Sequence, residues 1–506
     1  MFNLNYEKIR KWAVIYMTLP VVLFFLGWLK IWIAIPSVLL LGYGAYCVIN
    51  RRVEEHIDGS KGRNINISWK VLAGLVLLSL AWCFFAGQGG FYYQSPDYGC
   101  RNAVLRDMIN FDWPVIYKDY GNAMVYYIAY WMPAALIGKT VLVITASADA
   151  AWLAGNIALL LWSTCGVFIV FLLFIYSVNA NTTKKIWATV LLFIFFSGCD
   201  IVGQQILGGE FAWHIEWWNS IYQYSSITTC LFWVFNQSVI PWMVIMCLVN
   251  EKNVKNYAYI GLMCLPVGPF PFLGVFIYCV LVAIKWGVEA IREKSFDKYI
   301  KSMFTVSNLT AILIVVPIFW TYFTCNAAMT NAGTGGGFCF FWQEVDVSPI
   351  SGALVYILFY LLEVGLYLLL IRKDYRKNIW FHITAVSLMF IALFRMGGSV
   401  DFAMRVSIPG ITITAFLVIR YLVNHYEDLK SSDTTRKSIY ALLIIVYFMG
   451  VFTPGFEFAR GINEVAKNHK LNVVCDDVVT FDKEGGFTNF VTQDYSEKFF
   501  FKYLAR

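Results

Sequence analysis

The sequence predicts an all-α polytopic membrane protein, and its composition and its apolar runs indicate this fold. Of its 506 residues, 59% are hydrophobic and only 14% are charged, whereas a soluble domain carries roughly 25% charged residues. Apolar runs of about 17–25 residues recur along the chain, each long enough to cross a hydrocarbon core. These runs lack the alternation of a membrane barrel, so we expect helices.

Twelve apolar segments are candidate spans. They are residues 11–28, 31–49, 69–87, 123–142, 152–177, 186–202, 224–249, 307–323, 351–371, 380–396, 406–422 and 438–455. A further block, residues 257–285, is interrupted by three prolines, so we expect a re-entrant or paired half-helix element. We therefore predict a bundle of about 12–14 spans, the first of them a retained anchor.

Basic residues in the short connections predict the orientation. They gather at 51–52, 252–255, 292–301, 372–377 and 430–437, which we expect on the cytoplasmic side together with the N-terminus. Between residue 122 and Lys184–Lys185 this scheme needs an odd number of crossings, but two apolar blocks lie there. Either one block bends back or lies along the interface, or the lysine pair faces outward.

This orientation divides the chain into three parts. They are residues 1–68, with two N-terminal spans and a cytoplasmic loop; 69–455, a membrane core with outer loops 88–122, 203–223 and 324–350; and 456–506, a small extracytoplasmic segment. Four cysteines fall in predicted outer segments, where two of them could form a disulfide whose pairing the sequence does not give: Cys100, Cys325, Cys339 and Cys475. The net charge of +7 comes without a dense basic stripe, so we expect no nucleic-acid partner.

The loop 88–122 is rich in charged residues. Residues 99–110 follow a Ser-Pro-Asp turn and predict a short amphipathic helix along the membrane surface. Asp97 precedes this helix at the outer boundary, where partial desolvation tunes a carboxylate, and is our candidate catalytic base. Arg101 and Asp107 lie on the same predicted helix. The alternative interpretation is that the acidic residues of this loop form ordinary solvent-exposed ion pairs with its arginines.

A second polar group is embedded among tryptophans in residues 208–242. Polar side chains near a span usually face a cavity or another helix. The candidates for a sugar or acceptor pocket are His214, Glu216, Gln223, Asn236 and Gln237. His214 and Glu216 are only two possible metal ligands, which is a weak signal for a metal site.

A third group lies at 395–410, in the outer turn between two spans. Asp401 and Arg405 are four residues apart and can pair on one helical face. Arginine is also well shaped to hold a phosphate, and Gly397-Gly398 would permit a close approach, so we favour Arg405 as a phosphate ligand over a snorkelling cation.

Taken together, these features resemble the GT-C superfamily of polyprenyl-phosphate-sugar-dependent glycosyltransferases. The likeness lies in the many spans, in the acid-bearing long outer loop with its amphipathic helix, and in the aromatic run from Tyr126-Tyr127 to Pro133. It extends over about residues 69–250 and is completed by a terminal outer segment. Here Asp97 follows the third predicted span rather than the first, and the tail has no WWD motif.

The resemblance implies a GT-C-like bundle and a reaction at the outer face. A sugar would pass from a polyprenyl-phosphate-sugar donor to a glycan or lipid acceptor, with Asp97 as general base and Arg101 and Arg405 on the phosphate. The setting would be a bacterial plasma membrane, with a divalent metal optional, held by Asp97 with Asp107 or Glu216. The rival interpretations are a transporter or flippase built on residues 257–285, and a non-catalytic scaffold.

Overall fold

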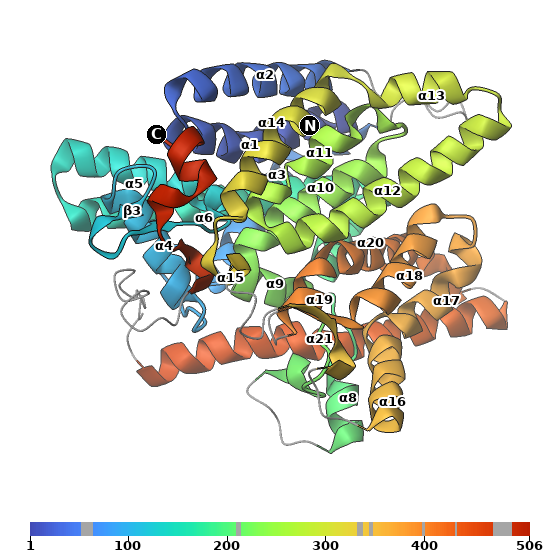
Figure 1. The fold of residues 1–506 in the computed structure, drawn as a ribbon. Helices are drawn as coiled ribbons and strands as arrows, with labels where there is room; N and C mark the ends of the chain where they lie inside the picture. Colours follow the sequence, from blue (N-terminus) through green and yellow to red (C-terminus); the bar gives the residue numbers. More distant parts are fainter. Residues whose placement is uncertain are drawn as a thin grey trace.

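The protein is a bundle of helices, to which the described part of the chain adds three small antiparallel sheets (Figure 1). In this computed structural model, the described residues are 1–51, 64–208, 214–330, 337–343, 348–396, 400–430, 433–468 and 488–506. The predicted helical multi-pass fold is confirmed.

Within these ranges, eight helices are long and apolar enough to cross a membrane. They are α1 (Tyr6–Trp28), α2 (Ile31–Asn50), the stretch Ile128–Thr145 that contains α5 (Met132–Thr145), α6 (Ala148–Val178), α12 (Pro269–Arg292), α14 (Val306–Phe323), the stretch Ile350–Tyr375 formed by α16 (Pro349–Tyr360) and α17 (Leu366–Tyr375), and α21 (Thr434–Asn468). Three shorter apolar helices join them: α3 (Trp69–Phe85), α18 (Ile379–Ile391) and α20 (Ile408–Asn424).

A bent pair of helices makes a ninth span if the two helices are counted together. Helices α9 (Ile227–Val234) and α10 (Val239–Asn250), with the 3₁₀ turn Phe235–Gln237 between them, bend by 103° at their junction. Every residue of α10 from Val239 to Leu248 is buried, so this helix lies at the centre of the bundle, as a helix that is apolar all round should. The remaining helices are α4 (Tyr98–Asn110), α7 (Thr183–Ile194), α8 (Asp200–Leu207), α11 (Tyr257–Leu262), α13 (Phe296–Met303), α15 (Ala327–Thr330) and α19 (Asp401–Val406).

Two of the predicted basic connections, at 51–52 and 252–255, meet at one end of the bundle. Arg51, after α2, donates to the backbone oxygen of Lys255 at 2.6 Å. The buried Arg10 of α1 pairs with Glu251 at 3.2 Å. These contacts bring segments from three parts of the chain to one basic end.

Helices α5 and α6 bear on the crossing that the sequence left open. Tyr130, just before α5, donates to Ser163 at the middle of α6 at 2.9 Å. The far end of α6 lies at the basic end, where Asn250 donates to Ser177 at 2.7 Å. Because α5 begins halfway along α6 and returns to its first residue, α5 runs beside only half of α6, which favours the alternative in which the first apolar block bends back.

The proline-broken block also returns to the end where it began. Tyr257 at the start of α11 packs against Trp286 late in α12, with ring centroids 5.2 Å apart. The turn between these helices falls at Gly268, where a Cβ atom would meet the side chain of Gln237. The predicted pair of half-helices is found only in part, because α11 is short but α12 is a continuous helix of 24 residues that is long enough to cross a membrane by itself.

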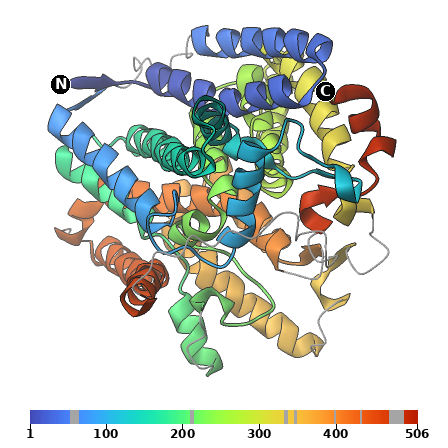
Figure 2. The ribbon, with the colours of Figure 1, turned by 90° about the vertical axis from the view of Figure 1, so that its left-hand side faces the viewer.

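At the opposite end, the C-terminal residues cover the loop that follows α4. Strand β7 (Val491–Thr492) pairs with β4 (Asn122–Met124), which pairs with β3 (Ile116–Tyr117), so the red C-terminal segment lies beside the cyan loop (Figure 2). The other strands are β1 (Phe2–Leu4) with β2 (Ile65–Ile67), and β5 (Phe338–Phe340) with β6 (Phe394–Met396). No disulfide joins two of the cysteines that the structure describes, and Cys475 lies outside the described residues.

One prediction about the outer segments was wrong. The helix predicted at 99–110 exists as α4, but it is not an amphipathic surface helix, since most of its residues are buried. Its Ile109 fills the space beside Gly138 of α5 and Gly155 of α6, where a Cβ atom would collide with it. At the end of the predicted membrane core, α21 continues as one helix through residue 455 to Asn468.

Candidate functional site

A cavity of about 1740 Å³ lies inside the bundle and has one polar region and one apolar wall. Among its polar lining residues are Asp97, Arg101, Tyr126, Tyr127, His214, Gln223, Ser225, Thr229, Asp401 and Arg405. Thus three segments that the sequence singled out separately, around residues 97, 214 and 405, face one space.

The first polar group is an ion pair at the start of α4. Asp97 flanks the first residue of this helix, and Arg101 lies one turn later, with its Nη2 atom 2.8 Å from Asp97 Oδ2. The Asp97 side chain is 44% exposed whereas that of Arg101 is 5% exposed. Arg101 Nη1 has no hydrogen-bond acceptor among the described residues, so the guanidinium keeps an unused donor.

The second group repeats this arrangement on α19. Arg405 Nη2 lies 3.0 Å from Asp401 Oδ2, and the carboxylate is again the more exposed partner, at 45% against 15%. Arg405 Nη1 also donates to the hydroxyl of Tyr127 at 3.2 Å.

The two ion pairs interact electrostatically across the cavity. Burial on its own would lower the pKa of Arg405, but Tyr127, Asp401, Tyr126 and Asp97 together raise it. Burial raises the pKa of Tyr126, and the charges of Arg405 and Arg101 both oppose that rise. Asp97, Arg101 and Arg405 therefore act on the same small region.

The apolar wall of the cavity is formed mainly by α11, α12 and α14. On α12 it runs from Phe270 to Ala283, which is about 20 Å at 1.5 Å per residue. Facing side chains on α14 include Ile312, Val316 and Trp320. The wall begins beside the second ion pair, where Phe270 packs on Phe402 of α19 with ring centroids 5.4 Å apart.

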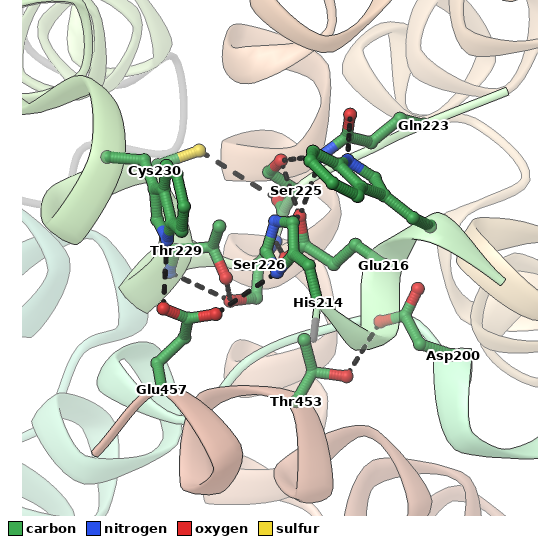
Figure 3. A network of polar contacts seen from close by, with 12 residues as sticks. Asp200, His214, Glu216, Gln223, Ser225, Ser226, Thr229, Cys230, Thr453 and Glu457 are labelled. Atoms are coloured by element: carbon green, nitrogen blue, oxygen red, sulfur yellow. Dashed lines mark hydrogen bonds and ion pairs between the residues drawn. The ribbon is translucent and has the colours of Figure 1, made fainter. Parts of the chain in front are cut away.

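The third polar group is a network around His214 (Figure 3). The imidazole lies between two buried carboxylates, with Nδ1 3.2 Å from Glu457 Oε1 and Nε2 3.6 Å from Glu216 Oε2. Glu216 accepts hydrogen bonds from the Ser225 hydroxyl at 2.7 Å and the Ser226 amide at 2.8 Å.

His214 and Glu216 both have shifted pKa values. Burial lowers the pKa of His214, but its hydrogen bond to Glu457 and the charge of Glu216 outweigh burial and raise it above its usual 6.5. Burial raises the pKa of Glu216, and His214 offsets part of that rise. The loop therefore holds a proton more readily than the same residues would in water.

Four predicted residues do not line the cavity: Asn236, Gln237, Asp107 and Glu216. Asn236 and Gln237 are wholly buried at the bend between α9 and α10 and are absent from the cavity lining. Asp107 accepts a hydrogen bond from Tyr117 at 2.8 Å. It lies ten residues beyond Asp97 on one helix, about 15 Å along the axis, so these two acids cannot share a metal ion.

The carboxylate of Glu216 accepts hydrogen bonds from Ser225 and Ser226 of its own loop, so it is not available to bind a metal ion. Within the described residues, no group of three or more His, Cys, Asp or Glu side chains is arranged to hold a metal ion. Gly397-Gly398 lie outside those residues.

Sequence reasoning missed Glu457 and Arg460, which reach the network from the extension of α21. Glu457 accepts from Trp233 at 2.9 Å and from Arg460 at 2.5 Å. The sequence contains a signal for this pair, because Glu457 and Arg460 are three residues apart and follow the apolar run directly. This spacing predicts that the helix continues and that the two side chains lie on one face of it.

Comparison with known proteins adds no relative. No family model, curated protein or solved structure matches this chain.

Proposed function

We propose that the protein is an integral membrane glycosyltransferase that moves a sugar from a polyprenyl-phosphate carrier to a cell-envelope glycan or lipid acceptor. One observation carries this proposal: two Asp–Arg pairs, Asp97–Arg101 and Asp401–Arg405, face one cavity whose other wall is apolar. A lipid-linked sugar phosphate has the matching chemistry, with an anionic head and a long apolar chain.

The two arginines are suited to a phosphate. Guanidinium groups bind phosphate oxygens through paired N–H donors, and both arginines have buried N–H groups without a protein acceptor among the described residues. Their positive charge would stabilise the negative charge that develops on the phosphate as the sugar leaves.

Asp97 is suited to accept the proton of the acceptor hydroxyl. Its carboxylate is the more exposed member of its pair and lines the cavity. Its pairing with Arg101 keeps the side chain in place, which a general base requires. Asp401 has the same exposure on the other side, where it holds Arg405 in position.

The carrier chain would lie along α12 and α14. A wall of about 20 Å accommodates several isoprene units, and burial of each methylene contributes about 0.8 kcal/mol. We place the basic end in the cytoplasm of a bacterial cell and the C-terminal segment outside, which is supported by the clustering of Arg10, Arg51 and Lys255.

The test is sugar transfer from purified radiolabelled polyprenyl-phosphate-sugars to a membrane glycan extract. The wild type is compared with Asp97→Asn and with Asp119→Asn, whose carboxylate is exposed and outside the cavity. Transfer that persists in Asp119→Asn and collapses in Asp97→Asn supports the proposal. Equal transfer by all three proteins rejects Asp97 as the base, and no transfer with any donor rejects the function.

A transporter or flippase is the second candidate, favoured by one observation. Two interrupted helical segments meet inside the bundle, where Gly268 approaches Gln237. Broken helices of this kind form substrate sites in transporters. Protein in liposomes that moves a lipid-linked sugar across the bilayer, without transferring the sugar, would support this function instead.

A further inference from the structure

Trp217 presents a fixed aromatic surface to the cavity. It is 49% exposed and lines the cavity, but its indole N–H donates to Gln223 Oε1 at 3.2 Å. The amide of Gln223 in turn donates to Glu216 Oε2 at 3.2 Å. A chain of hydrogen bonds therefore ties a half-exposed indole to a wholly buried carboxylate.

The neighbouring aromatic residue, Trp233, plays a different part. One neighbour of its ring is His214, stacked at 5.2 Å with an interplanar angle of 23°. The Arg460 guanidinium also lies over the Trp233 ring, 5.3 Å from its centroid. With these partners and its hydrogen bond to Glu457, Trp233 supports the network, whereas Trp217 is the ring left open to a ligand.

The charged groups behind Trp217 are engaged with one another. Glu216 and Glu457 contact His214 and Arg460, and of these four side chains only His214 lines the cavity. The other described polar groups that line the cavity beside Trp217 are the amide of Gln223 and the hydroxyls of Ser225 and Thr229. Such a surface does not favour a phosphate or a basic side chain. It suits a neutral ring that has an apolar face and hydroxyl groups on its edge.

We propose that the wall formed by Trp217, Gln223, Ser225 and Thr229 binds the acceptor, and that the acceptor is a neutral saccharide stacked on Trp217. The inference rests on the proposed transferase function, because it places the acceptor in the cavity that holds the donor. A flat pyranose face matches an indole that is fixed before binding, since a pre-organised ring loses little entropy when the ligand arrives. Glu216 is then a positioning residue that acts through Gln223.

The test separates acceptor binding from donor binding. Initial transfer rates are measured with the radiolabelled donor that the wild type uses, first against increasing glycan extract and then against increasing donor. In Trp217→Ala we expect KM for the acceptor to rise about tenfold or more while KM for the donor stays unchanged. Trp217→Phe keeps an aromatic ring without the N–H and should recover most of the loss, and Trp32→Ala, a change of an exposed tryptophan outside the cavity, is the control.

The chemical identity of the product completes the test. We expect the label on a saccharide hydroxyl, released by glycosidases and resistant to protease. A label on protein or directly on a lipid hydroxyl, an unchanged acceptor KM in Trp217→Ala, or a raised donor KM instead would each overturn the inference while leaving the transferase function intact. Absence of transfer by the wild type would instead reject the function on which the inference rests.

Discussion

Asp97 at the start of α4 lies close enough to Arg405 of α19 for its charge to help raise the pKa of that guanidinium. The two residues come from segments that are distant in sequence, and both line the cavity. Each also has its own partner four residues away on its own helix. The site is therefore built from two local pairs that the bundle brings together.

Arg405→Gln should reduce sugar transfer by about 100-fold or more, because it removes a cation placed to stabilise the leaving phosphate. Arg405→Lys should recover only part of the activity, since an ammonium group cannot hold a phosphate through two parallel hydrogen bonds. Initial rates at saturating donor measure the effect. Arg372→Gln, an exposed change outside the cavity, is the control and should transfer normally. Wild-type rates in Arg405→Gln would remove Arg405 from the mechanism.

Each Asp–Arg pair could be predicted from the sequence, but the proximity of the two pairs in the fold could not. Four-residue spacing on a helix predicted Asp401–Arg405, and the position of Asp97 before a predicted helix made it a candidate. Their proximity depends on how α4, which packs on α5 and α6, is brought near α19, which packs on α12, and no local sequence pattern predicts this.

The errors have physical causes as well. The charged residues of α4 suggested a surface helix, but Arg101 and Asp107 are paired inside the protein with Asp97 and Tyr117. Glu457 lay beyond the end of the apolar run, where a hydropathy window stops although the helix continues. Buried polar groups that form hydrogen bonds with one another cannot be predicted from the average polarity of a segment.

Deprotonation of His214 should make the protein less stable as the pH rises through the neutral range. Because the pKa of His214 in the folded protein is raised above 6.5, its stabilising contribution is complete below pH 6.5 and is lost as pH rises through the folded pKa. The readout is Tm in detergent between about pH 5.5 and 8.5.

Glu457→Gln removes the main group that raises this pKa. We expect the variant to lose less Tm than the wild type between the acidic and alkaline ends of that range. His382→Asn, which changes an exposed histidine, serves as the control and should keep the wild-type slope. Parallel curves for wild type and Glu457→Gln would show that the His214–Glu457 contact does not determine the pH dependence.

The buried pair at the basic end predicts a large loss of stability when one partner is removed. Arg10 and Glu251 have side chains that are 1% and 5% exposed. Glu251→Ala should destabilise the protein by about 3–5 kcal/mol, because it leaves the Arg10 charge buried without its carboxylate. The double variant Arg10→Met/Glu251→Leu should lie closer to the wild type.

Thermal unfolding in one detergent compares these variants with Glu289→Ala. That change removes an exposed pair with Lys285 and should cost no more than about 1 kcal/mol. Equal losses from Glu251→Ala and Glu289→Ala would mean that water reaches the Arg10 side chain.

The return of α5 predicts which side of the membrane each end of α6 faces. Cysteines placed at Asp119 and Asp149 should react with an impermeant maleimide from the same side, and a cysteine at Lys184 only from the opposite side, since α6 makes the single crossing between them. All three positions are exposed, and the parent protein measures labelling of the native thiols. If Asp149→Cys and Lys184→Cys were labelled from one side, α5 would have to cross the membrane and the contact of Tyr130 with Ser163 at the middle of α6 could not exist.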